Sequence, residues 1–273
     1  MTTATETPHL VLSEAAYTLP TDLLPNQHVV YTGCLAISAD GKIHPAHTPG
    51  STFVKLGSPN DIAHLLAVRA HVDALIFGGE TFRAYPKWRS PQQYDDSTAS
   101  ASSHQPLQVL LTRGGEACVT AIPPTSPAFT HSQQNPLPDK PPFWIVSQHE
   151  VPARGRAQYP TWVRWLTLPT ETPQAQWLWL DSQLAAAGIR TASVEGGGQI
   201  VGWALQAQAL QQLYLTLCPW LLGQGATPLV EGLGFSRDTA PRLTLTHHAA
   251  SDNELFLVYH IRYPHDGLSL ATR

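Results

Sequence analysis

The chain has 273 residues, of which 42% are hydrophobic and 13% are charged. That length is enough to bury a full hydrophobic core. The formal net charge is −4, and the lysines and arginines are scattered rather than clustered. This composition argues against a nucleic-acid-binding module and against electrostatic attachment to an anionic membrane.

The chain carries no sign of export or membrane insertion. Its first residues lack the basic start and apolar core of a secretory signal, and no apolar run approaches membrane-spanning length. The three cysteines, Cys34, Cys118 and Cys218, are far apart and odd in number. They are typical of small buried side chains in a reducing compartment, so we expect a cytoplasmic globular protein without disulfides.

The N-terminal stretch differs from the rest of the chain. Residues 1–27 are rich in threonine and proline and carry little periodicity, so we expect a loosely ordered arm in which Leu10–Leu12 could pair on a sheet edge. Residues 28–263 are expected to form one domain, because a single run of alternating elements fills them. A tail at 264–273 follows.

Two stretches of this domain are predicted to be surface insertions. The one near 87–106 is polar and has almost no apolar pattern, and the one near 120–142 contains seven prolines. Prolines at this density exclude a regular element from the second stretch.

Helix signals stand at three places. Ser58 is followed by a proline and can cap a helix that runs to about Arg69. Thr172 begins a second helix in the same way, and Gly188 is its natural stop. A third helix is expected over 199–208.

Strands are expected between these helices. The fully apolar run Ala74–Phe77 is typical of a strand covered on both faces. The expected strands cover 28–37, 74–77, 107–111, 143–146, 191–194, 213–217, 242–249 and 254–262. This alternation predicts an α/β fold with a mixed, mostly parallel sheet flanked by helices, and the last two strands form a C-terminal antiparallel hairpin.

The run Val194–Gly198 stands where an apolar strand meets a helix. A helix N-terminus presents unpaired N–H groups there, and three successive glycines let a phosphate approach the backbone, so a pyrophosphate is the expected ligand. A tight turn would need only one glycine. A Rossmann site is excluded, because the G-x-G-x-x-G order is not met and no acidic residue ends the next strand.

Glu195 is the acidic residue of this neighbourhood, at the carboxyl end of a strand. Open α/β sheets bind ligands at that edge. We expect its carboxylate to accept a hydrogen bond from a substrate hydroxyl or ring N–H; a helix-dipole partner or a salt bridge is the ordinary alternative.

Several blocks together resemble the pyrimidine reductases of riboflavin biosynthesis, the C-terminal domain of the bifunctional deaminase–reductase. The resemblance extends from about residue 28 to 262, and the blocks agree in order and spacing with few gaps. The matching blocks are Ser38–Ile43, Val68–Ala70 with Asp73-Ala74, Gly78–Arg83, Val194–Gly198 and Cys218–Gly223.

This resemblance implies a dihydrofolate-reductase-like fold and a homodimer. It also implies hydride transfer from NADPH to the ribosyl group of 5-amino-6-(5-phosphoribosylamino)uracil, a small phosphorylated pyrimidine, giving the ribityl compound. By the resemblance, Glu195 and Asp40 are the catalytic candidates, and Arg69 and Glu195 contact the substrate. The implied NADPH contacts are Ala36, Thr81, Arg83, Gly196, Gly197, Gly198, Gln199, Ile200, Val201 and Gly202.

Each of these candidates also has an ordinary structural reading. Arg69 could cap carbonyls or pair with Asp73, Thr81 could cap a short helix, and Asp40 could simply begin an Asp-Gly turn. Arg83 is expected to meet a phosphate, since guanidinium groups bind phosphate oxygens bidentately.

The sequence departs from the family pattern at three points. Ala84-Tyr85-Pro86 replaces an acidic pair and a proline, Ala209–Gln212 replaces L-V-D-E, and the expected basic residue has only Lys87 and Arg89 as rough equivalents. These positions touch substrate and NADPH contacts. A reductase of the same fold acting on another small carbonyl or pterin-like substrate therefore stays open, as does a non-catalytic nucleotide-binding homologue.

No metal is expected. The H-x-E and P-C-x-x-C spacing of the zinc deaminase half is absent. His44 and His47 lie in a proline-containing loop, and His247-His248 alternate across a strand, so their side chains diverge. No histidine, Tyr–Lys pair or cysteine stands out as a general acid, so a protonated intermediate or a water could supply the proton.

Overall fold

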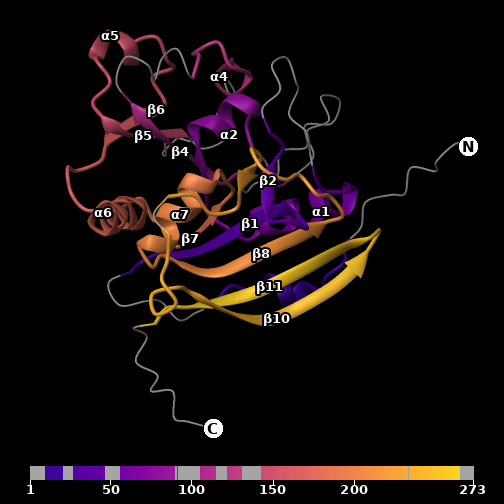
Figure 1. Cartoon of the computed structure of the whole chain (residues 1–273). Coiled ribbons are helices and arrows are strands. Elements are labelled where there is room, and N and C mark those ends of the chain that lie inside the picture. The colour runs from indigo at the N-terminus through magenta and orange to yellow at the C-terminus, as the bar shows by residue number, and fades with distance from the viewer. Residues whose placement is uncertain are drawn as a thin grey trace, which may run out of the picture.

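The computed structural model describes residues 10–20, 27–46, 56–89, 91, 105–114, 122–130, 143–232 and 234–264. A nine-stranded sheet runs through them in the order β10-β11-β8-β1-β7-β3-β4-β5-β6 (Figure 1). Its strands are β1 (Val30–Ser38), β3 (Ala74–Gly78), β4 (Leu107–Gly114), β5 (Phe143–His149), β6 (Val163–Thr167), β7 (Thr191–Val194), β8 (Leu210–Cys218), β10 (Arg242–Ser251) and β11 (Glu254–Arg262).

The sheet is mixed in the way the sequence predicts. The seven strands from β8 to β6 pair in parallel, β11 pairs antiparallel with β8, and β10 pairs antiparallel with β11. The two-residue turn between β10 and β11 places Asp252 and Asn253 at positive φ, as a tight hairpin requires. The mostly parallel sheet and its C-terminal hairpin are therefore confirmed.

Helices cover both faces of the sheet. They are α1 (Pro59–Ala70), α2 (Gly79–Ala84), α4 (Pro127–Thr130), α5 (Ala153–Arg156), α6 (Pro173–Ala186) and α7 (Gly198–Gln206), with a 3-10 turn η1 (Glu14–Tyr17). Ser58 and Thr172 accept N-cap hydrogen bonds at the starts of α1 and α6, as expected from sequence.

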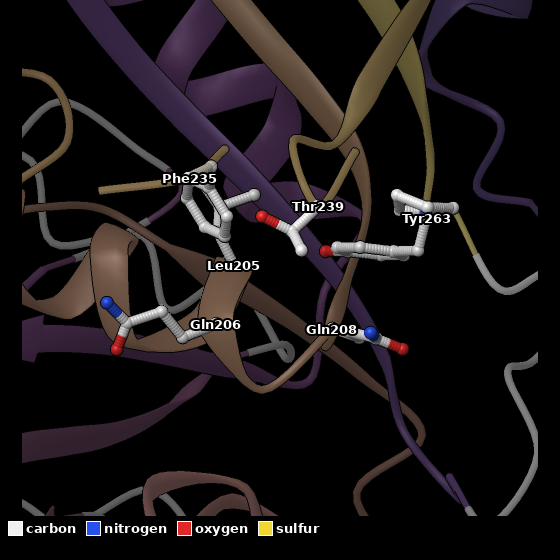
Figure 2. A pocket seen from close by; sticks show the side chains of 7 residues that line it. Leu205, Gln206, Gln208, Phe235, Thr239 and Tyr263 are labelled. Atoms are coloured by element: carbon white, nitrogen blue, oxygen red, sulfur yellow. The ribbon is translucent and has the colours of Figure 1, made fainter. Parts of the chain in front are cut away.

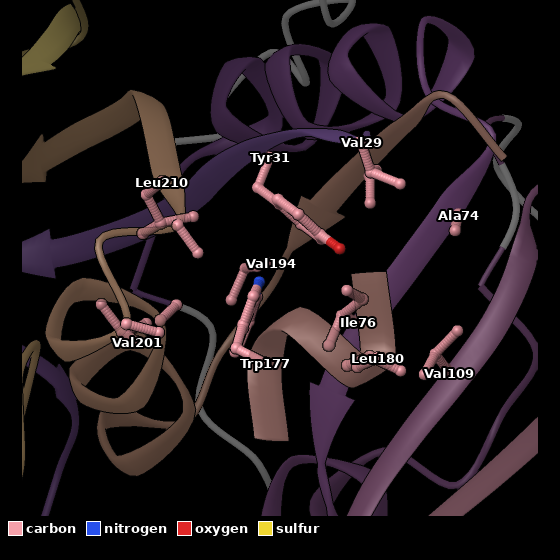
Figure 3. Close-up of a cluster of buried hydrophobic side chains, with 14 of the residues drawn as sticks. Val29, Tyr31, Ala74, Ile76, Val109, Trp177, Leu180, Val194, Val201 and Leu210 are labelled. Atoms are coloured by element: carbon pink, nitrogen blue, oxygen red, sulfur yellow. The ribbon is translucent and has the colours of Figure 1, made fainter. Parts of the chain in front are cut away.

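The largest core lies between the sheet and helices α6 and α7 (Figure 3). Trp177 and Leu180 of α6 and Val201 of α7 pack on Tyr31 and Ile76 of the central strands, and all five are at most 1% exposed. Burial of this amount of aliphatic and aromatic surface is the main stabilising term of such a fold. The core fixes where α7 begins, and so where the glycine run lies.

The opposite face carries two further clusters. One surrounds Phe77, Phe82 and Phe129, and joins α2 and α4 to β3 and its neighbours. The other surrounds Tyr17 and Tyr214, and joins η1 and α1 to β8 and β11.

The second predicted insertion contains a helix, contrary to the expectation that its prolines exclude a regular element. Pro127 begins the single turn α4, where the missing N–H of a proline costs nothing. Phe129 is 2% exposed in the phenylalanine-rich cluster, so this part of the insertion is anchored in the core. The remaining residues of this insertion, 120–121 and 131–142, and most of 87–106 lie outside the described residues.

The described part of the N-terminal arm is also packed rather than loose. Leu10–Leu12 form no strand; instead Leu12 and Tyr17 are buried, with Tyr17 on η1. The sequence likewise missed β6, a half-exposed edge strand, and the small sheet of β2 (Lys42–His44) and β9 (Thr227–Pro228).

Candidate functional site

The candidate residues gather at the carboxyl ends of the parallel strands. Ser38 ends β1, Val194 ends β7 and Gly78 ends β3, and these three strands are neighbours in the sheet. The Glu195 amide donates to the Ile76 carbonyl, and the Gly78 amide donates to the Gly196 carbonyl at 3.2 Å. The glycine run is thus joined directly to the end of β3, at the edge where such sheets bind ligands.

Glu195 and Arg69 form a bidentate ion pair. Arg69 Nε lies 2.7 Å from Glu195 Oε1, and Arg69 Nη2 lies 2.6 Å from Oε2. The two side chains are only 12% and 4% exposed. Two parallel charge-assisted bonds fix both groups in orientation. Arg69 therefore pairs with Glu195 and not with Asp73, whose carboxylate accepts from the start of β7.

Arg89 is a second cation at the same carboxylate. Its Nε lies 3.9 Å from Glu195 Oε2, and its side chain is 3% exposed. The guanidinium stacks on the ring of Phe77 at 3.8 Å and donates two long hydrogen bonds of 3.4 Å, to the carbonyls of Lys87 and Thr81. Burial lowers the pKa of Arg89 to about 10, so it stays charged at neutral pH.

The sequence indicates Arg89 only as a rough equivalent of a basic family position, and Arg89 is not among the predicted site residues. The structure places two guanidinium groups around one carboxylate, which leaves an excess positive charge at this point. The Tyr85 ring, one of the departures from the family pattern, lies 5.9 Å from the Arg89 guanidinium. Tyr85 therefore borders the cluster of Arg69, Glu195 and Arg89.

Thr81 lies between the Arg69–Glu195–Arg89 cluster and the start of α7. Its hydroxyl accepts a hydrogen bond of 3.0 Å from the Gly197 amide at the start of α7. Thr81 is not the cap of a short helix, since it lies inside α2, whose N-cap is Gly78. A Cβ on Gly196 or Gly197 would meet the Thr81 hydroxyl at 3.7 Å, an ordinary contact. These two glycines thus leave the N-terminus of α7 open to approach.

Gly198 and Gly202 serve a different purpose. A Cβ on Gly198 would lie 2.5 Å from the carbonyl oxygen of Pro228, and one on Gly202 would lie 1.8 Å from that of Glu231. The Glu231 amide donates to the Gly198 carbonyl at 3.0 Å. These two glycines therefore make room for the backbone of 228–231, which packs against α7.

One exposed arginine lies beside this helix start and a second lies on α2. Arg113 at the end of β4 lies 3.4 Å from the side-chain oxygen of Gln199, and Arg83 on α2 pairs with Glu80 at 3.1 Å. Arg83 is 46% exposed. Arg113 was not among the predicted site residues, because only the parallel pairing of the strands brings the end of β4 near α7.

The remaining predicted cofactor residues divide by orientation. Val201 is 1% exposed and points into the core. Ile200 lies against Gly78, where a Cβ would meet its side chain at 3.1 Å. Ala36 is half-buried in β1, opposite Thr216 of β8.

Asp40 holds a loop. Its carboxylate accepts from the hydroxyl of Ser38 at 2.6 Å and from the amides of Leu222 and Gly223 at 3.0 and 2.7 Å. The Ser38 bond and these two backbone bonds lower the pKa of Asp40 to about 2. The predicted Asp-Gly turn is present, with Gly41 at a φ of 78°, and its carboxylate clasps the loop that follows β8.

Outside this edge, the described residues show few features of a binding site. No group of three or more metal-ligating side chains occurs among them, and none of their helices is long and apolar enough to cross a membrane. A small pocket lies at the other end of α7, lined by Leu205, Gln208 and Tyr263 among others (Figure 2). It is separate from the glycine run.

A buried carboxylate with two arginines thus lies beside the start of α7, at the carboxyl edge of the mixed sheet of an α/β protein, the edge where such sheets bind ligands. The model of the RibD C-terminal domain matches residues 31–257. The chain belongs to this family of riboflavin-biosynthesis reductases, so it is an oxidoreductase. No curated protein matches the chain.

Solved structures share the fold. A pyrimidine reductase-like protein from Corynebacterium diphtheriae has a TM-score of 0.64 and 20% identity, covering 86% of this chain and 92% of that one. Acinetobacter baumannii RibD has a TM-score of 0.62 and 18% identity over 87% of this chain, which spans 59% of its length. The riboflavin biosynthesis reductase Rib7 of Saccharomyces cerevisiae has a TM-score of 0.60 and 14% identity, covering 89% and 93%.

Proposed function

We propose that the chain reduces 5-amino-6-(5-phosphoribosylamino)uracil to its ribitylamino form with NADPH as hydride donor. The observation that carries this proposal is the pair of adjoining half-sites. One is the open start of α7 at Gly196 and Gly197, and the other is the Arg69–Glu195–Arg89 cluster. Thr81 lies between them.

The cofactor half fits a dinucleotide. Helix α7 has nine residues, so its N-terminus carries the positive end of a full helix dipole. Gly196 and Gly197 put no side chain before the helix start, whose Gly197 amide donates to Thr81, and Arg113 beside Gln199 and Arg83 on α2 supply positive charge. We assign the pyrophosphate to Gly196, Gly197 and Thr81, and we assign the 2′-phosphate that distinguishes NADPH from NADH to Arg113.

The roles of the other predicted cofactor residues follow from their orientation. Gly198, Val201 and Gly202 shape the helix and its packing. Gln199, Ile200 and Ala36 line the approach. When bound, NADPH supplies the hydride; the protein binds, orients and excludes water around the reacting carbon.

The substrate half fits a phosphorylated pyrimidine. The excess positive charge of Arg69 and Arg89 over Glu195 favours an anionic substrate. Glu195 can accept a hydrogen bond from a substrate hydroxyl or ring N–H, since each carboxylate oxygen accepts more than one bond. Asp40, ionised and already holding Leu222 and Gly223, positions the adjoining loop instead of donating a proton.

A homodimer in the cytoplasm is the proposed working form. Strand β10 is an edge of the sheet, and Leu243 and Leu245 on it are 49% and 47% exposed. Exposed leucines on an unpaired edge strand favour association. Light scattering on the purified protein should give twice the chain mass, and the double variant Leu243→Asp/Leu245→Asp should give the chain mass alone. A monomeric native protein would contradict this.

A second function remains supported by one observation. Tyr85 stands beside Arg89 where the family pattern has an acidic residue, which favours a different small carbonyl or pterin-like substrate. A non-catalytic homologue is disfavoured by the fully assembled Arg69–Glu195 pair and the Thr81–Gly197 bond.

The purified protein tests these alternatives directly. NADPH oxidation, followed at its nicotinamide absorbance with the ribosylaminouracil phosphate as substrate, should be matched mole for mole by the ribityl product. NADPH binding without turnover would reject the proposed substrate and favour a different small carbonyl or pterin-like substrate. Absence of NADPH binding would reject the reductase proposal altogether.

A further inference from the structure

Residues 10–20 precede the family match, which begins at residue 31, and they are nevertheless part of the core. Leu12 is 6% exposed, Ala16 is 1% exposed and Tyr17 is 2% exposed. They pack with Val68 of α1 and with Phe256 of β11. This chain therefore covers one face of its sheet with a segment outside the family domain.

Tyr17 contacts α1 on both sides of Arg69 along the chain. Its hydroxyl and His64 Nδ1 share a hydrogen bond of 2.8 Å, and its ring stacks on His71 at 6.0 Å with 16° between the planes. His64 is 2% exposed, and His71 is the C-cap residue of α1. One tyrosine thus touches the part of the helix that carries Arg69.

The Tyr17 ring also contacts the sheet. Tyr214 of β8 stacks on it at 5.9 Å with 18° between the planes. The Tyr214 hydroxyl donates to the Ala16 carbonyl at 3.1 Å. His71, Tyr17 and Tyr214 therefore stack in series from the end of α1 to strand β8.

This cluster adjoins the substrate half of the site. Cys34 of β1 is one of its buried members. Burial raises the pKa of the Cys34 thiol, and the Glu195 carboxylate raises it further. Gly33, the residue before Cys34, pairs with Val194, the residue before Glu195, so the cluster and the ion pair lie beside the same two neighbouring strands.

We propose that Tyr17 is a positioning residue for the substrate half of the site, acting through α1 on Arg69. The Arg69–Glu195 pair has two parallel bonds of 2.6 and 2.7 Å, and such a bidentate pair depends on the relative orientation of its two groups. Tyr17 holds the helix where the fork closes. The inference rests on the proposed function, because it assigns that ion pair to the substrate.

The test uses the full chain with two changes at Tyr17. Tyr17→Phe removes only the hydroxyl that meets His64, and Tyr17→Ala removes the stack as well. Tyr263→Phe is the matched control, since Tyr263 is 5% exposed and its hydroxyl donates to the Leu210 carbonyl, outside the Tyr17 cluster. The measurements are KM for the pyrimidine substrate, Kd for NADPH and the melting temperature.

The expected result separates the two half-sites. Tyr17→Phe should raise KM about threefold, since a net hydrogen bond is worth roughly that factor. Tyr17→Ala also removes the ring stack and should raise KM about tenfold or more. The Kd for NADPH should stay within about twofold in both. If Tyr17→Phe lowers the melting temperature as Tyr263→Phe does and leaves KM unchanged, Tyr17 is only a stability residue. If KM and Kd rise together, the positioning is not specific to Arg69.

A second measurement separates this inference from the proposed function. Hydrogen exchange of the α1 amides in the protein alone should quicken in Tyr17→Phe relative to α6 and to Tyr263→Phe. If the native protein does not turn over the pyrimidine, the proposed function fails while the exchange still reports on α1. Unchanged α1 exchange in Tyr17→Phe would overturn the positioning role whatever the substrate.

Discussion

Gly202 lies so close to Glu231 that a Cβ on Gly202 would stand 1.8 Å from the Glu231 carbonyl oxygen. Backbone cannot yield to such a contact without moving the whole 228–231 segment. Gly202→Ala should therefore lower the free energy of unfolding by about 1–3 kcal/mol, the usual cost of overpacking. Urea unfolding measures it, and an unchanged stability would contradict the packing role of this glycine.

Gly197→Ala should behave in the opposite way. A Cβ on Gly197 would meet only the Thr81 hydroxyl, at 3.7 Å, so it would clash with no other part of the fold. The methyl group would stand where a phosphate must approach α7, and we expect Kd for NADPH to rise about tenfold. Fluorescence titration with NADPH decides this; unchanged binding would remove Gly197 from the proposed cofactor contacts.

Arg113 should set the preference for NADPH over NADH. Its guanidinium lies beside Gln199 on the exposed rim of the cofactor half. Arg113→Gln should weaken NADPH binding about tenfold, the value of one charge-assisted bond to a phosphate, and leave NADH binding as it is. Arg83→Gln is the comparison on the other flank. Equal losses for both nucleotides would place Arg113 away from the 2′-phosphate.

Asp40 should matter through its loop and not through a proton. Its pKa of about 2, set first by the Ser38 hydroxyl, keeps it ionised at neutral pH. A depressed pKa means that its contribution to stability is present above about pH 4 and is lost as the pH falls through about 2. Asp40→Asn should lower kcat/KM less than about tenfold. A loss of about 100-fold or more would identify a proton-transfer role.

His64 should make the stability of the protein sensitive to acid. Burial lowers its pKa from 6.5 to about 4, while Tyr17, Tyr214 and Phe256 surround its ring. Below about pH 6.5 His64 binds a proton in the unfolded chain but not in the folded chain. The free energy of unfolding is therefore highest above that pH and declines as the pH falls towards 4. Urea unfolding at pH 7 and pH 5 should show a smaller loss in His64→Gln than in the native chain.

Most of the fold can be predicted from the sequence, because the local patterns of the helices and strands agree with the way these elements pack together. The predicted bounds of β7 and β11 match the structure, and Ser58 caps α1 as its pattern indicates. The predicted strand over 213–217 begins three residues later than β8, because Gln211 and Gln212 are polar and do not indicate a buried strand. In the folded chain the Gln211 side-chain oxygen accepts from the Tyr31 amide at 2.7 Å, so a distant partner satisfies a buried amide.

The site was less accessible to sequence reasoning, for the same reason. Arg69 and Glu195 are 126 residues apart, and no local pattern says that they pair with each other. Arg89 lies in a stretch read as an insertion, and only the folded chain brings it to Glu195. Gly198 and Gly202 are predicted cofactor contacts, and no local pattern in the sequence indicates that the 228–231 segment packs against them.

The most direct test of the two half-sites is Glu195→Gln, with the exposed Glu150→Gln as its control. The change leaves two buried guanidinium groups without their carboxylate, so the free energy of unfolding should fall by about 3–5 kcal/mol.

The decisive measurement on Glu195→Gln is kcat/KM for the pyrimidine beside Kd for NADPH, made under conditions where the variant is folded. We expect kcat/KM to fall at least about 100-fold while Kd for NADPH stays within about twofold. Turnover that survives the change, or NADPH binding that is lost with it, would contradict the assignment of Glu195 to the substrate and of the glycine run to the cofactor.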